Sequence, residues 1–356
     1  MSKVSLMGDA MFDTVQALQA HLVPGLSTPA GFGRLLELAR VLPGIHRGGI
    51  ECRLAGEDSQ VDLFQAIAGS LGEPEGLLRW IDQGAADGHG HPAWQRLRAF
   101  CAAWSDPASV LHANVSAIWL ELDAGVPAPS VFITLLPEAL KGADPEAITA
   151  EALTILLGAE AVAALRNPVR ACFDAAAGIA HVRQVGVMLA RQARAVRIVV
   201  HPLGSQHITA YLTRVGWPGA LDQVETLVNE LRGKVDRIDL LHLDVGERVL
   251  PKVGLEGLCD ETRGAGRGWS AFLDHLVAQG WCTPSKRAAL LAWPGTTDLA
   301  PGPSARLPDK LTVLRRRLSH VKLVHQPGVT WEAKAYLWFG RIRFGLVPAL
   351  LEEGIR

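Results

Sequence analysis

The chain has 356 residues, of which 49% are hydrophobic and 20% are charged, and its 35 Lys and Arg against 36 Asp and Glu give a formal charge of −1. The composition is typical of a compact globular protein, and the length allows one large domain or two ordinary ones, each with a sizeable core. The near-neutral charge argues against a whole-molecule nucleic-acid or membrane-surface binder. The five cysteines form no C-x-x-C pair, so the sequence indicates neither a disulfide framework nor a zinc knuckle. Because no apolar run is long enough for a signal peptide or a membrane-spanning helix, we expect a cytoplasmic protein with no membrane or nucleic-acid partner.

The first part of the chain has a helical pattern. Apolar residues recur at three-to-four spacing in two sets, which are Phe12, Val15, Leu18 and Leu22, and Val61, Phe64, Ile67, Ala68 and Leu71. We therefore predict that residues 1–110 form a helical N-terminal region packed on a main domain of residues 111–356.

The main domain begins with a different pattern, in which pairs of short strands alternate with helices. β-branched and aromatic runs flank short Pro- or Gly-containing turns, as expected for hairpins. The predicted strand pairs are 116–123 with 130–136, 195–201 with 206–212, 237–246 with 250–258, and 320–326 with 331–339. Helices are expected at 144–166 and 169–193, separated by Pro168, and after the second and third pairs. The basic run at residues 315–317 is expected on a solvated helix face.

The order of these elements decides the fold class. The helices follow hairpins and not single strands, which disfavours the parallel sheet of a Rossmann fold. We predict an α/β protein of the α+β kind: a mainly antiparallel sheet, or a closed barrel, of repeated strand pairs with helices outside.

Basic side chains share one face of several predicted strands. Residues two apart on a strand point the same way, so Glu332, Lys334, Tyr336 and Trp338 lie on one face. If the helices cover the apolar face, the basic face points into the barrel and forms an anion site. The candidates are Arg197, Tyr211, Lys252, Lys322, Lys334 and Tyr336. The alternative is that these charges lie on the solvated face of an open sheet.

The strand pairs, the WLELD segment at residues 119–123 and the K-x-Y of Lys334 and Tyr336 resemble the ABBA-type aromatic prenyltransferases, the superfamily of the dimethylallyl tryptophan synthases. The resemblance covers roughly residues 116–343. It implies transfer of a prenyl group from an allylic diphosphate to an aromatic acceptor, which is a small molecule or a peptide side chain. It also implies that Glu121 is the catalytic carboxylate that orients the acceptor, and that the six basic and tyrosine candidates bind the diphosphate.

The sequence departs from the family pattern in two ways. The strand at 130–136 has no lysine where the family usually has a basic residue. The chain also has only two tyrosines, whereas in the family tyrosine rings usually shield the allylic cation, so Trp119 and Trp338 would take that role here. No DDxxD motif is present. The sequence therefore requires no cofactor, and a magnesium requirement stays open.

Other functions stay open from the residues alone. Glu121 alternates with Leu120 and Leu122, as on any half-exposed strand, and Glu256 is an equally good inward carboxylate. The leading alternative is a non-catalytic binding or accessory protein that holds a peptide or an anionic ligand in the same concave face. A metallohydrolase built on histidines is disfavoured, because no pair shows helical i, i+4 ligand spacing beside a carboxylate, and His89 and His91 are expected in a loop.

Overall fold

The computed structural model describes residues 11–40, 42–44, 47–56, 61–83, 91–123, 126, 128–142, 144–191, 194–259, 267–299 and 312–343. The strands are β1 (Arg47–Arg53), β2 (Val61–Ala68), β3 (Val115–Leu122), β4 (Ser130–Leu135), β5 (His181–Val187), β6 (Val196–His201), β7 (Arg237–Val245), β8 (Val249–Leu258), β9 (Gly295–Leu299), β10 (Thr312–His325) and β11 (Glu332–Arg343). The α-helices are α1 (Met11–Ala17), α2 (Pro29–Arg40), α3 (Glu73–Asp82), α4 (Pro92–Ser105), α5 (Val110–Asn114), α6 (Pro137–Gly142), α7 (Pro145–Leu157), α8 (Ala159–Ala176), α9 (Ile208–Arg214), α10 (Leu221–Leu231), α11 (Arg267–Ala278) and α12 (Pro284–Ala292). Short 3-10 turns are η1 (Gly69–Leu71), η3 (Leu189–Arg191) and η4 (Ser205–His207).

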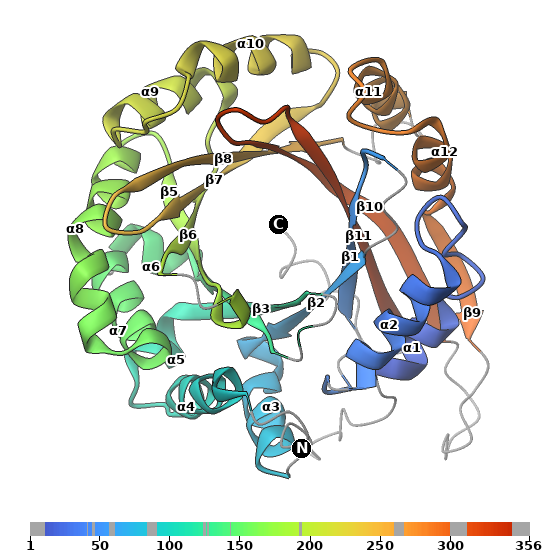
Figure 1. The fold of residues 1–356 in the computed structure, drawn as a ribbon. Coiled ribbons are helices and arrows are strands. Elements are labelled where there is room, and N and C mark those ends of the chain that lie inside the picture. The colour runs from blue at the N-terminus through green and yellow to red at the C-terminus, as the bar shows by residue number, and fades with distance from the viewer. Residues whose placement is uncertain are drawn as a thin grey trace.

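The strands form one closed antiparallel barrel. The order is β11-β1-β2-β3-β4-β5-β6-β7-β8-β10, and β11 also pairs with β10, which closes the ring, while β9 extends from the first half of β10. Closure pairs both edges of every barrel strand and leaves no open edge within the ring. The helices surround the ring on its outside, as the view along the barrel in Figure 1 shows. The predicted fold class is confirmed.

The core lies between the outer face of the barrel and these helices. Outward side chains such as Leu120, Ile198 and Leu243 are fully buried, and they belong to one apolar cluster with helix residues such as Leu153 and Leu227. The outer face is therefore occupied by hydrocarbon, which leaves the opposite face of each strand for the polar residues of the interior.

The helical prediction for residues 61–71 is wrong, because residues 61–68 form β2. This strand is buried on both faces, since Phe64 packs inside the barrel while Leu63 and Ile67 face the helices, and a continuous apolar run can mimic helical spacing. With β1, it places two barrel strands within residues 1–110, where only helices were expected. One sheet therefore contains strands from both predicted regions.

The second predicted hairpin is also wrong. β6 pairs with β5 and β7, whereas the segment after its turn forms η4 and α9. Ile208, Tyr211 and Leu212 are buried at i, i+3 and i+4, a helical spacing that outweighs their β-forming residue types. The missing partner is β5, which lies inside the stretch predicted as a helix over 169–193.

Two smaller corrections concern element ends. Pro168 lies inside α8, and the break between α7 and α8 occurs at Gly158, whose φ of 92° suits a glycine. β10 begins at Thr312, so the basic run at 315–317 lies on a strand and not on a helix. The pairs β3 with β4, β7 with β8 and β10 with β11 are confirmed.

Candidate active site inside the barrel

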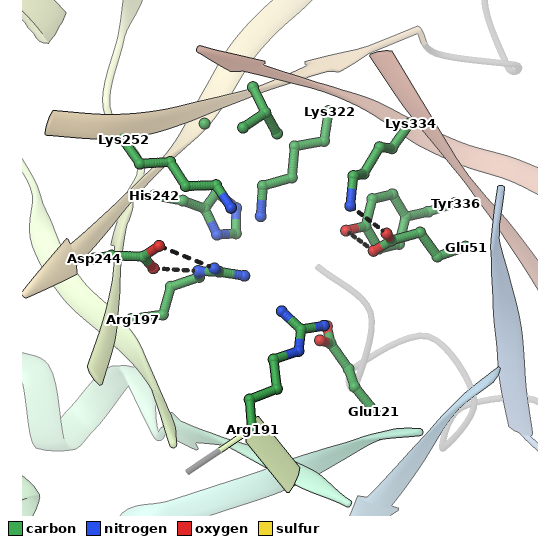
Figure 2. A pocket seen from close by; sticks show the side chains of 12 residues that line it. Glu51, Glu121, Arg191, Arg197, His242, Asp244, Lys252, Lys322, Lys334 and Tyr336 are labelled. Atoms are coloured by element: carbon green, nitrogen blue, oxygen red, sulfur yellow. Dashed lines mark hydrogen bonds and ion pairs between the residues drawn. The ribbon is translucent and has the colours of Figure 1, made fainter. Parts of the chain in front are cut away.

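A polar pocket lies inside the barrel, and Figure 2 shows the side chains that line it. Alternation along each strand turns every second side chain inward, and the register aligns Glu51 with Tyr336, Arg197 with Asp244, and Lys322 with Lys334. The space between the lining side chains is about 450 Å³, which includes space open to solvent. The lining residues are Glu51, Glu121, Arg191, Arg197, His242, Asp244, Lys252, Gly254, Lys322, Val324, Lys334 and Tyr336.

A second hollow continues from this pocket and has an acidic lining. It shares Glu51, Glu121 and Arg191 with the first pocket and adds Asp62 and Asp123, with an empty volume of about 240 Å³. The second hollow is therefore net acidic, with four carboxylates against Arg191, whereas the three lysines and Arg197 line only the first pocket.

Aromatic rings fill the barrel next to the pocket. The Phe64 ring lies 5.8 Å from the Trp119 ring and 5.9 Å from the Tyr336 ring, measured between centroids. A Cβ on Gly49 would come within 2.0 Å of the Phe64 ring, and one on Gly186 within 2.4 Å of the Phe132 ring. These two glycines make room for the rings, which fill this part of the barrel with hydrocarbon.

Both arginines of the pocket are held by carboxylates. Arg197 donates to both oxygens of Asp244 at 2.7 and 3.2 Å, and Arg191 donates to both oxygens of Asp123 at 2.6 and 2.5 Å. Although burial opposes ionisation of Asp244, the Arg197 guanidinium holds the pKa of this carboxyl below its ordinary value. These bidentate pairs fix the planes of the guanidinium groups.

Two lysines of the pocket have no hydrogen bond or ion pair with any residue that the structure describes. They are Lys252 and Lys322, whose ammonium groups point into the cavity in Figure 2. Burial and the neighbouring Arg197 lower the pKa of both, that of Lys322 to about 8. Lys322 is only 6% exposed, so it carries a buried charge that an anionic ligand would stabilise.

Glu51 joins two residues of the last strand. It accepts from Lys334 Nζ at 2.7 Å and from the Tyr336 hydroxyl at 2.5 Å. Burial alone would raise the pKa of Glu51, but the Lys334 ammonium and the two hydrogen bonds bring it to about 2. Glu51 is therefore a carboxylate at neutral pH.

Glu121 is the carboxyl with the opposite shift. Burial and the negative charge of Glu51 raise the pKa of Glu121 to about 7, although Arg197 and Lys322 oppose the rise. Glu121 makes no hydrogen bond or ion pair with the described residues. Two carboxyls with divergent pKa values in one pocket are typical of a site that both accepts and holds protons.

A pair of imidazoles flanks a third buried carboxylate. Glu256 Oε1 lies 2.6 Å from His242 Nε2, and Glu256 Oε2 lies 3.5 Å from His320 Nε2. The His320 ring stacks on Tyr336 at 4.2 Å between centroids. His242 belongs to the pocket lining, so this cluster connects the pocket to the interior of the barrel.

The structure brings six of the nine predicted site residues into the pocket. These are Glu121, Arg197, Lys252, Lys322, Lys334 and Tyr336. Trp119 and Trp338 lie on the inward faces of β3 and β11 beyond the pocket lining, where Trp119 packs on Phe64 and Trp338 packs under the Arg317 guanidinium. Tyr211 is elsewhere: it lies on α9, fully buried outside the barrel, and its hydroxyl donates to the Cys172 carbonyl at 3.4 Å.

Sequence reasoning missed four charged or titratable residues of the site. They are Glu51, Arg191, His242 and Asp244. Glu51 lies on β1, in a region predicted to be helical, and Arg191 lies in η3, after a strand that was predicted as a helix. His242 and Asp244 do alternate along a correctly predicted strand, so the spacing rule applied to Lys252 could have found them.

Comparison with solved structures gives the fold. The prenyltransferase PriB in its apo form aligns at 17% identity with a TM-score of 0.57, covering 93% of this chain and 96% of that chain. The 5-dimethylallyl tryptophan synthase from Streptomyces coelicolor aligns at 15% identity with a TM-score of 0.53, covering 92% and 95%. AnaPT from Neosartorya fischeri aligns at 12% identity with a TM-score of 0.51, covering 91% and 97%. This chain has the fold of the ABBA-type aromatic prenyltransferases.

No protein-family model and no curated protein matches the sequence. The same fold is thus reached with little sequence identity, and the pocket must be interpreted from its own residues.

Within the described ranges, no group of three or more His, Cys, Asp or Glu side chains is placed to hold a metal ion. His91 caps α4, whereas His89 lies outside the described residues. Of the helices that the structure describes, none has the length and apolar character needed to span a bilayer.

Proposed function

We propose that this protein transfers a prenyl group from an allylic diphosphate to an aromatic acceptor. The observation that carries the proposal is the collection of five cationic side chains inside a closed barrel, two of them lysines without a partner among the described residues. The ABBA prenyltransferase fold supports it independently.

The basic side of the pocket suits the diphosphate. Arg197, Lys252 and Lys322 converge there from three different strands. With five cations against three carboxylates, the lining carries a formal charge of +2, which rises to +3 when Glu121 is protonated. An allylic diphosphate carries about three negative charges near neutral pH, so this lining can neutralise it.

Known complexes of the structural neighbours agree with this choice of ligands. PriB has been solved with L-tryptophan and dimethylallyl thiolodiphosphate, and with the product diphosphate. The Streptomyces coelicolor synthase has been solved with DMASPP and Trp. By analogy of fold, we assign the diphosphate and an aromatic acceptor to the barrel interior of this chain.

The acidic side of the pocket suits the acceptor. Cleavage of the allylic C–O bond releases diphosphate, whose growing charge Lys252 and Lys322 would stabilise. The aromatic ring then attacks the allylic cation, and the arenium intermediate loses one proton to a carboxylate. Glu51 and Glu121 are the candidate acceptors of that proton, and the filled barrel interior beside them limits access of water to the cation.

The tyrosine shield expected for this family is reduced. Of the two tyrosines in the chain, only Tyr336 lies in the pocket, and its hydroxyl is held by Glu51. Phe64 and Trp119 provide the neighbouring ring faces, which can stabilise a cation in the same way.

The test is a direct activity assay. The protein is incubated with dimethylallyl or geranyl diphosphate and a panel of indoles, phenols and aromatic peptides, with and without Mg²⁺. We expect a product heavier by one prenyl unit, detected by mass spectrometry, together with release of diphosphate. The panel also identifies the chain length, the acceptor class and the metal requirement.

A matched pair of variants separates the pocket from general effects. Lys252→Met removes an ammonium from the pocket, whereas Lys141→Met removes an exposed one from α6. Activity should fall in the first variant and stay unchanged in the second. Tight binding of diphosphate without turnover for any acceptor would favour the non-catalytic binding protein.

A further inference from the structure

His242 has an unusual environment for a residue of an anion pocket. Its Nε2 lies 2.6 Å from Glu256 Oε1, while its Nδ1 is buried and has no hydrogen-bond partner among the described residues. The residue as a whole is 7% exposed and belongs to the pocket lining. If Nε2 donates to Glu256, the Nδ1 lone pair is left as an unused acceptor within a positively charged group of side chains.

The charged and titratable groups around His242 come from several strands. They are Arg197 of β6, Asp244 of its own β7, Glu256 and Lys252 of β8, Lys322 and His320 of β10, and Glu51 of β1. Burial, followed by the charges of Lys322 and Arg197, holds the pKa of His242 well below its ordinary value in the empty pocket. His242 is therefore neutral there, and among the described residues Glu256 has no charged donor within hydrogen-bond distance.

An anion in the pocket reverses this balance. A ligand with about three negative charges offsets the lysines and arginine that oppose protonation of His242, and it is itself an acceptor for the Nδ1 atom. We propose that His242 takes up one proton when a diphosphate binds, and that the resulting imidazolium donates from Nε2 to Glu256 and from Nδ1 to a diphosphate oxygen. This inference rests on the proposed function, because it requires the diphosphate to occupy the basic side of the pocket.

The proton balance of this step is simple. When free diphosphate binds, neutral His242 takes one proton from the solvent. This proton binds to Nδ1, and no covalent bond of the ligand changes. When the allylic C–O bond later breaks, the added negative charge of the leaving diphosphate strengthens the hydrogen bond from Nδ1. His242 would therefore stabilise the leaving group as well as bind it.

Titration calorimetry with inorganic diphosphate measures the proton directly. The binding enthalpy is measured at one pH, above the pKa of the empty His242, in two buffers of different ionisation enthalpy, and the difference gives the number of protons taken up. The unmodified protein is compared with His242→Asn, which keeps a polar side chain but cannot titrate. Any protonation of the ligand or of Glu121 contributes to both proteins, so the difference between them isolates His242.

We expect His242→Asn to take up about one proton fewer and to bind diphosphate roughly 10- to 100-fold more weakly, as for the loss of a charge-assisted hydrogen bond. His320→Asn is the matched control, since His320 approaches the same carboxylate at 3.5 Å without lining the pocket, and it should keep the proton count. A ¹⁵N spectrum of the histidine rings of the unmodified protein gives the same answer without a variant, because both nitrogens of one ring should shift to imidazolium values on binding.

Each other outcome overturns the inference. Equal proton counts in the parent protein and in His242→Asn, or loss of the proton only in His320→Asn, would show that His242 is not the acceptor. Binding without any proton linkage leaves the proposed function intact and removes this inference alone, whereas absence of diphosphate binding removes both.

Discussion

Removing the charge of Lys322 should change stability and affinity in opposite directions. Lys322 is 6% exposed and has no ion pair or hydrogen bond with a described residue. In the empty protein its charge is a cost of burial, whereas in a diphosphate complex the same charge contributes to binding. Lys322→Met keeps an unbranched side chain of nearly the same length and removes the ammonium group.

The size of the stability effect follows from the pKa. A fall in the pKa of Lys322 from 10.5 to about 8 corresponds to roughly 3 kcal/mol of unfavourable free energy for the charged folded form. Since the folded pKa of Lys322 lies below the unfolded value, the neutral side chain carries no such penalty above pH 10.5, and the stability linked to Lys322 falls as the pH falls from 10.5 to about 8. At pH 7 the variant should therefore unfold at a temperature higher by roughly 4 °C, taking about 2.1 cal/mol/K of unfolding entropy per residue.

The affinity effect has the opposite sign. An ammonium about 4 Å from a phosphate oxygen contributes roughly 4 kcal/mol at an effective dielectric constant of about 20. The remaining cations compensate in part, so we expect diphosphate to bind about 100-fold more weakly. Thermal unfolding and calorimetric titration of the same two proteins measure both quantities, with Lys141→Met as the exposed control. A variant that is less stable and binds diphosphate normally would refute the reasoning, because Lys322 would then have a structural partner.

Three further outcomes follow from other residues. The pKa of Glu121 is raised to about 7, so the stability that protonated Glu121 contributes is present below pH 4.5 and is lost as the pH rises to about 7. The unfolding temperature should therefore fall between these pH values, and Glu121→Gln should remove that fall. Gly186→Ala forces a Cβ against a phenylalanine ring and should cost about 1–3 kcal/mol in denaturant unfolding, whereas Gly33→Ala, in open space on α2, should be neutral or stabilising by up to about 1 kcal/mol. Tyr211→Phe should lose about 1 kcal/mol of stability with an unchanged diphosphate Kd, because its hydroxyl donates to the Cys172 carbonyl outside the barrel; a weaker Kd would contradict that placement.

Hairpins made of two strand-like segments around a short connection were the predictable part of the fold. β3 with β4 and β7 with β8 combine β-branched, aromatic or leucine-rich segments with short connections, so local residue type and pairing agree. β2 was not predictable in this way, because the Phe64 ring packs into the barrel over a glycine of the neighbouring strand. That contact depends on pairing of β2 with β1, a strand that the sequence pattern did not indicate. Pairing with a neighbouring strand therefore decides the structure where local periodicity is ambiguous.

The site follows the same division. Lys322 and Lys334 could be placed from strand alternation alone, since their strands were recognised and lie in register. Glu51 could not, because its role depends on β1 closing against β11, which brings it to a residue 283 positions later in the chain. The prediction for Tyr211 was wrong because its segment was assigned to a strand, whereas tertiary packing makes that segment a helix.

The five cations of the pocket differ in how much charge they can offer a ligand. Arg191 and Arg197 are each compensated by a bidentate aspartate, and Lys334 is compensated by a glutamate, so these three mainly fix geometry. Lys252 and Lys322 alone offer charge without an ion pair to the described residues. Two such charges fall short of the roughly three that a diphosphate carries. Protonation of nearby groups can supply the difference, which is why diphosphate affinity should rise as the pH falls towards neutrality while the paired arginines stay unchanged.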